Sequence, residues 1–360
     1  MGRGSNRMSD WVSRKQFRVT NSLLSAATDY QIRFQVYRST GTDTATDVYI
    51  GTNCQEDFSD IRWTDSTGID EGLYEYWIES PTTSAVATCW VKMRYLPANS
   101  ATTVYLYYNN PNGVSAYSSG SNTFPFFDDF PGSALDTDKW SVTAGTPAVS
   151  SGVLTLAGNC QVTSDTGYGV NYAVRSRMKS GHYNTTSYSE RFYWITDWNN
   201  GAYAFFCGNK DWNKKFRTAD GGSYSTAAFD LWAADTYKVL EIIRNSTTSV
   251  IFNVDDVADA TISTNIDNGT NTLHIGSETA SGSVTLDWIL FRKYLSTEPT
   301  VEVVESGDTN TTTTKAYRIV GLEFDQDTGL FTIEFGAVED YYMSQDAKYR
   351  GAYDTSLSLM

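Results

Sequence analysis

Two tryptophans stand among polar residues in this chain, and exposed rings of this kind can bind sugars. Trp198 lies in the segment DWNNG and Trp212 in KDWN, and both segments read as hairpin turns. A ring stacks on the C–H face of a sugar while amides bind its hydroxyls, and exposing a tryptophan forfeits about 2 kcal/mol or more of burial energy. The predicted ligand-binding residues are Tyr193, Trp194, Trp198, Asn200, Trp212 and Asn213. For the two in a strand-like run, Tyr193 and Trp194, the alternative is burial in a core.

The sequence contains no recognisable pattern for nucleophilic or metal-dependent catalysis. His182 lies in the turn-like segment SGHYN and His274 in a strand-like segment, and no G-x-S-x-G element accompanies them. No HExxH motif and no phosphate-binding glycine loop occurs. We therefore expect one exposed loop histidine and one sheet-packed histidine, and we predict no catalytic residue.

Four cysteines are spread along the chain, and none belongs to a CxxC pair. A structural zinc site is therefore not expected. Their positions permit bridges between Cys54 and Cys89 and between Cys160 and Cys207. Four buried free thiols are the alternative, since cysteine is among the most often buried residue types.

The composition predicts a soluble, all-β protein. Among 360 residues there are 24 Tyr, 17 Phe and 10 Trp, and only 19% of residues are charged. Aromatic and β-branched side chains suit a pleated, half-buried surface. With 27 Lys+Arg against 42 Asp+Glu the net charge is −15, which argues against a nucleic-acid partner. No apolar run is long enough for membrane insertion, and the first residues lack the apolar core of a secretory signal.

Alternation of apolar and polar residues, interrupted by turn clusters, predicts many short strands. The Asn200-Gly201 pair is a further hairpin signal. In the first third of the chain the expected strands are 11–20, 30–38, 60–64, 74–79, 88–96 and 103–108. Later strands are expected at 191–197, 202–209, 214–220, 236–245, 249–256 and 272–278.

Residues 10–118 resemble a family known as domain of unknown function 2341. The segments that carry this resemblance are DIRWTDSTG at 60–68, YEYWIES at 74–80, ATCWVKMRYLPA at 87–98 and TTVYLYYNNP at 102–111. The family occurs in bacterial and archaeal surface proteins. The resemblance implies an extracellular β-sandwich, usually followed by a lectin-like jelly roll, with no assigned chemistry.

The segments FPFFDDFPGSALDTDKW at 124–140 and VTLDWILFRKY at 284–294 resemble the opening and closing strands of a concanavalin-A-like jelly roll. The resemblance extends to glycoside hydrolase family 16, whose ExDxxE motif supplies two catalytic carboxylates. No strand here carries that motif, so we predict that the chain is not an enzyme. Asp129 and Asp287 resemble positions that hold structural Ca²⁺ in some related jelly rolls; turn caps and solvated charges are the alternative.

These observations predict two tandem antiparallel sandwiches and a C-terminal extension. The expected parts are an N-terminal arm at 1–10, a sandwich at 11–118, a jelly roll at 119–303, and a linker, β-hairpin and tail at 304–360. A single hairpin is marginal alone, so residues 305–360 are expected to pack on the jelly roll or on a partner chain in a homo-oligomer or larger assembly.

The first hypothesis is a non-catalytic surface or virion protein, such as an adhesin, a tail fibre or a capsid decoration. Its jelly roll would bind a glycan or another cell-surface ligand, and its location would be extracellular, on a cell surface or in a virion. The alternative is a purely structural assembly subunit. An enzyme of the glycoside hydrolase type comes third.

Overall fold

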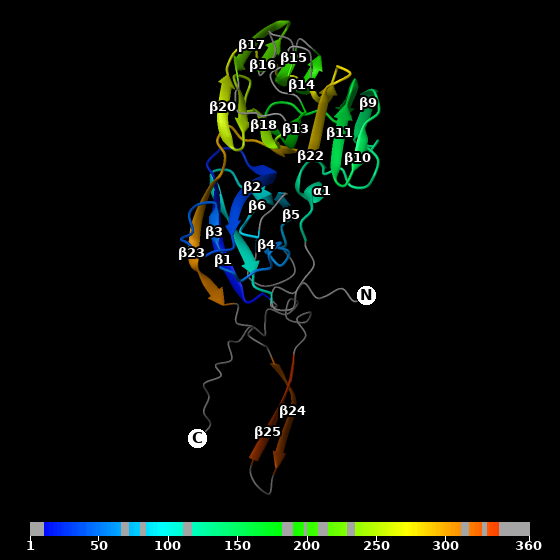
Figure 1. Cartoon of the computed structure of the whole chain (residues 1–360). Coiled ribbons are helices and arrows are strands. Elements are labelled where there is room, and N and C mark those ends of the chain that lie inside the picture. The colour runs from blue at the N-terminus through cyan, green and yellow to red at the C-terminus, as the bar shows by residue number, and fades with distance from the viewer. Residues whose placement is uncertain are drawn as a thin grey trace. The chain divides into compact units, whose positions relative to one another are not determined.

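The computed structural model describes residues 11–65, 72–79, 84–110, 117–181, 190–197, 200–207, 215–228, 235–310, 317–325 and 330–337. The chain divides into two units, residues 1–310 and residues 311–360 (Figure 1). The first unit holds two β-sandwiches, and the described part of the second unit is a β-hairpin. The predicted all-β class with tandem sandwiches is confirmed.

The first sandwich consists of two four-stranded sheets. Its strands are β1 (Ser13–Asn21), β2 (Ala27–Tyr37), β3 (Asp47–Tyr49), β4 (Arg62–Thr64), β5 (Tyr76–Glu79), β6 (Val86–Leu96), β7 (Ser100–Tyr108) and β23 (Thr300–Asn310). The sheet orders are β23-β1-β7-β4 and β3-β2-β6-β5. Alternate residues point inward, as in β1, so Phe17, Phe34 and Trp63 meet in an aromatic core.

The last strand of the first sandwich comes from beyond the jelly roll. The sequence predicts that the jelly roll runs to residue 303 and that a linker follows. In the structure, β23 pairs antiparallel with β1 from Thr300 onward, and Val301 and Val303 pack against the first core. The jelly roll is therefore inserted between β7 and β23. Sequence alternation marks β23 as a strand, but it cannot say which sheet the strand joins.

The jelly roll packs an eight-stranded sheet against a seven-stranded sheet. Before it stands a short helix, α1 (Gly120–Thr123). The strands of the eight-stranded sheet are β8 (Phe126–Asp128), β10 (Ala148–Ser150), β11 (Val153–Ala157), β13 (Tyr172–Ser180), β18 (Lys238–Arg244), β19 (Val250–Val254), β20 (Val257–Ile262) and β22 (Ser283–Lys293). Those of the seven-stranded sheet are β9 (Trp140–Ala144), β12 (Cys160–Ser164), β14 (Glu190–Asp197), β15 (Asn200–Cys207), β16 (Lys215–Asp220), β17 (Ser223–Ala228) and β21 (Thr272–Ser277).

The opening and closing strands of the jelly roll are neighbours, as the sequence predicts. β8 pairs with β22, and Phe127 lies opposite Leu290. Between the two sheets, a single core includes Trp140, Trp194 and Phe291. β14 and β15 pair as the predicted hairpin, with Asp197 opposite Asn200, and Asn200 and Gly201 are the first residues of β15. Gly201 has a φ of +143°, and a Cβ there would lie 2.4 Å from the Trp194 carbonyl oxygen.

A separate aromatic cluster joins the two sandwiches, and we call it the seam. It consists of Trp77, Trp90, Phe124, Phe127, Trp288 and Leu290. The indoles of Trp77 and Trp288 meet edge to face with ring centroids 5.2 Å apart. Trp288 is fully buried although it points out of the jelly-roll core. The run LDWILFR is apolar on both faces because β22 is covered on both faces.

Three of the cysteines have described side chains, and all three are buried free thiols: Cys54, Cys89 and Cys160. No bridge joins Cys54 to Cys89, so this permitted pairing does not form in the structure. Burial, with the charge of Asp60, raises the pKa of the Cys54 thiol to about 12. The side chain of Cys207 lies outside the described residues. In the described parts of the chain, no helix is long and apolar enough to cross a bilayer.

The predicted C-terminal hairpin is confirmed. β24 (Tyr317–Asp325) and β25 (Leu330–Ala337) pair antiparallel as a two-stranded sheet of their own. The register places apolar residue types opposite one another, as at Ile319 with Phe335 and Leu322 with Ile333. Charged types occupy the alternate positions, as at Glu323.

We predict that Trp288→Ala lowers the free energy of unfolding by about 3–5 kcal/mol, because the seam then contains a cavity. Since the seam belongs to both sandwiches, the substitution should also separate their unfolding into two calorimetric transitions. Differential scanning calorimetry of the purified chain measures both effects. Val142→Ala, at a position 47% exposed, is the control. A single, unshifted transition for Trp288→Ala would contradict the role of the seam.

Candidate functional site

The two outer faces of the jelly roll differ in what covers them. The seam packs the first sandwich on the outer face of the eight-stranded sheet. The contact of β2 with β22 is also made with the eight-stranded sheet. The inner positions of the seven-stranded sheet, such as Phe192, Trp194 and Phe216, belong to the core. The alternate positions therefore form an outer face, which we call the open face.

Three adjacent strands place polar side chains in a row across the open face. The register puts Ser141 of β9 opposite Thr163 of β12, and Thr163 opposite His274 of β21. The Thr163 hydroxyl lies 3.0 Å from His274 Nδ1, and the Thr272 hydroxyl lies 3.2 Å from Nε2. Burial lowers the pKa of His274, so the imidazole is neutral near pH 7. One ring nitrogen then donates a hydrogen bond to a threonine hydroxyl, and the other ring nitrogen accepts one.

An exposed aromatic ring lies on β17 of the same sheet. Tyr224 is 52% exposed, and the Arg217 guanidinium lies over its ring, 4.5 Å from the centroid. The neighbouring Ser225 points to the other side of β17, where its hydroxyl lies 2.6 Å from that of Thr264 and accepts from Asn265 at 2.8 Å. The open face thus offers hydroxyls, a neutral imidazole and a ring beside a cation.

Two of the predicted ligand-binding residues have described side chains, and neither is an open platform. Trp194 is fully buried, and its indole N–H lies 3.0 Å from both the Tyr168 and the Asn271 carbonyl oxygens. The prediction of Trp194 as a ligand contact is wrong, because side chains alternate along β14 and that of Trp194 points into the core. Asn200 is half-buried and accepts a hydrogen bond from the Gly221 amide at 3.0 Å, which ties two turns together.

The other predicted contacts lie outside what the structure describes. Trp198, Trp212 and Asn213 are outside the described residues altogether. For Tyr193 the backbone is described, and the register makes it the partner of both His274 and Tyr203. The Tyr193 position therefore belongs to the same row as His274.

The two carboxylates expected to hold calcium have different surroundings. Asp287 is 23% exposed and pairs with Arg177 at 2.5 Å, while Asp129 is exposed. The neighbouring Asp128 is buried and accepts a hydrogen bond from the Trp140 indole at 2.7 Å. Among the described residues, no group of three or more His, Cys, Asp or Glu could hold a metal ion. Calcium binding at Asp129 and Asp287 stays a prediction that this geometry does not favour.

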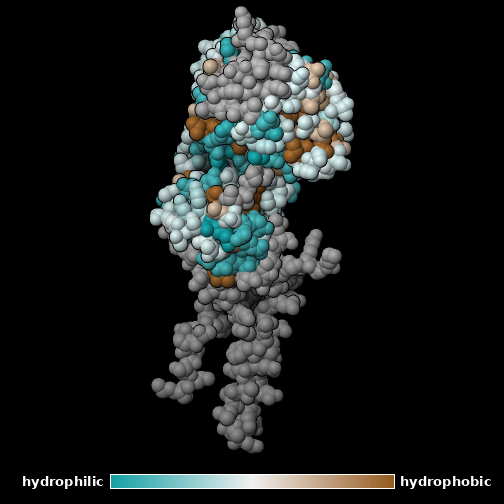
Figure 2. Space-filling view, in the orientation of Figure 1, coloured by the Kyte–Doolittle hydropathy of each residue, from teal (hydrophilic) through white to brown (hydrophobic). Residues whose placement is uncertain are grey.

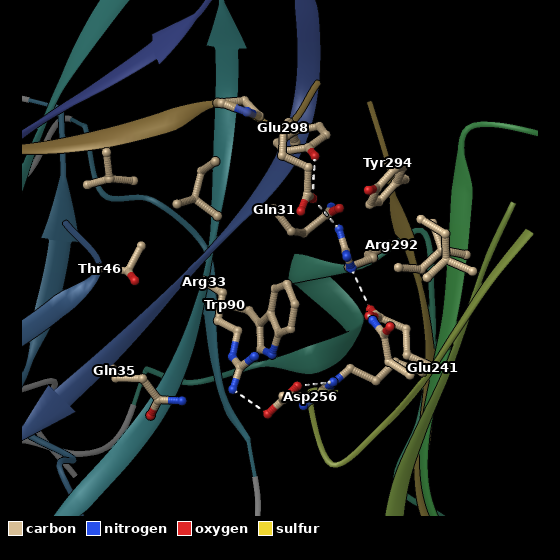
Figure 3. A pocket seen from close by; sticks show the side chains of 18 of the residues that line it. Gln31, Arg33, Gln35, Thr46, Trp90, Glu241, Asp256, Arg292, Tyr294 and Glu298 are labelled. Atoms are coloured by element: carbon tan, nitrogen blue, oxygen red, sulfur yellow. Dashed lines mark hydrogen bonds and ion pairs between the residues drawn. The ribbon is translucent and has the colours of Figure 1, made fainter. Parts of the chain in front are cut away.

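A second candidate site is a cavity of about 560 Å³ between the first sandwich and the jelly roll, which we call the junction pocket. One wall comes from β2, where Gln31, Arg33 and Gln35 alternate outward. The opposite wall comes from β18, β19 and β22, including Glu241 and Asn253 (Figure 3). Figure 2 shows hydrophilic colouring between the two sandwiches and only small, separate hydrophobic patches on this face.

Ion pairs centred on a buried arginine cross the base of the junction pocket. Arg175 of β13 is 1% exposed and binds Glu79 of the first sandwich at 2.9 Å and Asp256 at 2.7 Å. Arg33 of the first sandwich binds the other oxygen of Asp256 at 2.6 Å. Trp90 donates to Glu79 at 2.8 Å. Burial alone would lower the pKa of Arg175, but the surrounding carboxylates raise it, so the guanidinium stays charged.

A second group of charges lies at the other end of the pocket (Figure 3). Arg292 binds Glu241 at 2.8 Å and Glu298 at 2.7 Å, and the Tyr30 hydroxyl donates to Glu298 at 2.8 Å. Burial raises the pKa of Glu241, but Arg292 and Arg175 lower it, and the net shift is downward. Three guanidiniums, those of Arg33, Arg175 and Arg292, lie 5.4–5.9 Å from the Trp90 ring centroid.

The residues of this network do not follow from sequence motifs, but a local signal exists. Asp255 and Asp256 both have positive φ, 49° and 66°, in the turn from β19 to β20. Positive φ at both central residues is the pattern of a type I′ hairpin turn, which favours Asp, so the Asp-Asp pair between two strand-like segments is a sequence signal for this turn. A charge inside an apolar strand, such as Glu241 in VLEIIR, is the other signal.

One family model matches a segment that runs from the first sandwich into the jelly roll. Residues 57–143 match the family described as "Domain of unknown function (DUF2341)". The resemblance predicted from the sequence is thus confirmed, but over a segment that begins later than residue 10 and continues past residue 118. The matched segment contains Trp77, Trp90, Phe124 and Phe127 of the seam. No curated protein matches the chain.

Several solved structures share part of this architecture. A structure from work on the endo-acting O-glycanases that human gut microbiota express to initiate mucin breakdown is 12% identical, with a TM-score of 0.39, covering 48% of this chain and 99% of its own. A Bacillus licheniformis β-glucanase is 15% identical, with a TM-score of 0.38 and coverages of 47% and 97%. β-Agarase A in complex with oligoagarose is 12% identical, with a TM-score of 0.37 and coverages of 47% and 90%.

The prediction that the chain is not an enzyme is therefore wrong, because it excluded a class of protein that the similar structures include. Glycanases and glucanases recur among the similar structures, so membership of an enzyme class stays open. At 12–15% identity, these similarities assign no reaction to this chain.

The ion pairs that line the junction pocket predict how the stability of the fold changes with acid pH. The pKa of Asp256 is lowered on balance, because Arg175 and Arg33 outweigh its burial, and that of Glu241 is lowered too. Lowered carboxylate pKa values stabilise the fold above the unfolded-state values of about 4, and this stability is lost as pH falls through the folded-state values. We expect Asp256→Asn to flatten the fall in unfolding free energy below about pH 4.

Urea unfolding between neutral and acid pH measures this profile. The matched control is Asp235→Asn, because Asp235 is 69% exposed and pairs with Lys179 at 3.4 Å. Parallel profiles for the wild-type chain and Asp256→Asn would show that Asp256 does not contribute to the pH dependence.

Proposed function

We propose that this protein binds carbohydrate through the open face of its jelly roll. The observation that carries the proposal is the difference between the two outer faces. One is covered by the first sandwich at the seam, and the other carries the row Ser141, Thr163 and His274 with the exposed Tyr224.

The chemistry of the open face suits a neutral, hydroxyl-rich ligand. A sugar hydroxyl both donates and accepts, and the Thr163 hydroxyl, which is held in place by the neutral His274, can do the same. The Tyr224 ring offers an apolar face for sugar C–H groups. Trp198, Trp212 and Asn213 are proposed to add stacking and amide contacts from the turns, as the sequence predicts.

The finer proposal is an adhesive role outside the cell. A glycan-binding jelly roll attached to a second sandwich suits an adhesin, a tail fibre or a capsid decoration. The proposed location is accordingly extracellular, on a cell surface or in a virion. The glycan itself is not specified by the open face.

Glycan binding is expected to depend on the open face. We predict that Tyr224→Ala weakens binding by about tenfold and that Thr163→Val weakens it further, because each removes one contact of the kind a sugar needs. A glycan array identifies the ligand, and calorimetric titration gives the dissociation constants. Tyr95→Ala is the matched control, since Tyr95 is 55% exposed on the first sandwich.

Equal glycan affinity of Tyr224→Ala, Thr163→Val and the wild-type chain would show that the glycan does not bind at the open face. Each bound glycan is then incubated with the protein and assayed for new reducing ends, because the similar structures include glycanases.

A second proposed function is assembly through residues 305–360. It is supported by the hairpin of β24 and β25, which forms a two-stranded sheet with apolar residue types at one set of alternate positions. Two strands alone are marginal in water, so we propose that copies of the hairpin pack together in a homo-oligomer.

Removing residues 311–360 is expected to convert a defined oligomer into a monomer while both sandwiches stay folded, because the first unit contains both complete cores. Multi-angle light scattering of the full and shortened chains measures the mass in solution. A full-length monomer would rule out this assembly.

A further inference from the structure

The junction pocket retains hydrogen-bonding groups that its ion pairs do not use. Gln35 accepts from Thr88 through its carbonyl oxygen, and its amide N–H groups have no partner among the described residues. The Thr46 hydroxyl and the Tyr294 hydroxyl also line the pocket without such a partner. Asn253 donates to Glu241 and keeps its carbonyl oxygen available. Donors and acceptors therefore come from both sandwiches.

An apolar strip lies beside these polar groups. Ile243 and Ile251 line the wall formed by β18 and β19, and Ala258 follows on β20. Val301 completes the strip at the start of β23. The half-buried Tyr294 adds an aromatic ring at the end of β22. Sugars pair hydroxyl edges with C–H faces, and this lining offers both surfaces.

The charge of the pocket selects against ionic ligands. Three arginines and three carboxylates line it, so their formal charges cancel. Each arginine is bound to at least one of these carboxylates. An anion or a cation would have to break such a pair and leave a charge unpaired, which is costly when the pair is buried. A neutral ligand can accept and donate without breaking a pair.

We propose that the junction pocket is a second ligand site, which takes a neutral saccharide of one or two units. Its volume of about 560 Å³ lies within the range of small-molecule sites, and such sites often form between domains. Because both sandwiches supply contacts, a bound sugar also holds the sandwiches together. This proposal does not rest on glycan binding at the open face.

The test is a titration of the full-length chain with glucose, galactose, lactose and maltose, followed by saturation-transfer NMR and calorimetry. At least one sugar is expected to bind with a dissociation constant of about 1 mM or tighter. Ala258→Trp fills the pocket from an exposed position and should abolish this binding. Tyr294→Phe removes one hydroxyl without changing the shape of the pocket, and it should weaken binding by about threefold to tenfold.

The controls separate this site from the open face. Thr143→Val, at an exposed position of β9, should leave binding unchanged, and so should Tyr95→Ala on the first sandwich. Loss of binding in Tyr224→Ala alone would assign the sugar to the open face and overturn the proposal. Absence of binding by all four sugars, or equal binding by Ala258→Trp and Tyr294→Phe, would also overturn it.

Discussion

The arrangement of this molecule depends on a buried cation at the outer face of a jelly-roll sheet. Arg175 is 1% exposed and lies between the seam tryptophans, 5.7 Å from the Trp90 ring and 5.9 Å from the Trp288 ring. An uncompensated charge in such surroundings costs about 3–5 kcal/mol. Glu79 of the first sandwich and Asp256 of the jelly roll both compensate this charge, so the two sandwiches share one buried arginine.

This requirement decides which surfaces are available to a ligand. Because Trp288 and Leu290 are buried at the seam, the eight-stranded sheet has its outer face occupied. The seven-stranded sheet keeps the open face, with His274 and Tyr224. At the margin of the seam, the charges of both sandwiches pair around the junction pocket rather than filling it. The interface between the two sandwiches therefore decides which residues pack at the seam and which surfaces a ligand can reach.

The sequence was informative about strands and about the fold, for identifiable reasons. Alternation locates β1, β2, β6 and β14 within a few residues, because one face of each strand is apolar. The continuous apolar run at β22 signals burial on both faces. The pairing of strands that are distant in sequence produces no local sequence pattern. The return of β23 to the first sandwich was therefore not predicted.

The candidate site was harder to predict than the fold. Trp194 sits next to polar turns in sequence, yet strand alternation turns it into the core. Arg175, Glu241 and Asp256 acquire their roles only when two sandwiches meet, and no spacing within one strand encodes that contact. The row of polar side chains that contains Thr163 and His274 forms between strands that are distant in sequence. It can therefore be recognised only from the register of the sheet.

The central claim is that ligand binding uses the open face because the other face is covered. Hydrogen–deuterium exchange of the full-length chain, with and without the glycan found on the array, tests it most directly. The account predicts slower exchange on binding in β12, β21 and the β16–β17 hairpin, with β2 and β6 unchanged. Protection confined to the first sandwich or to the eight-stranded sheet would contradict it.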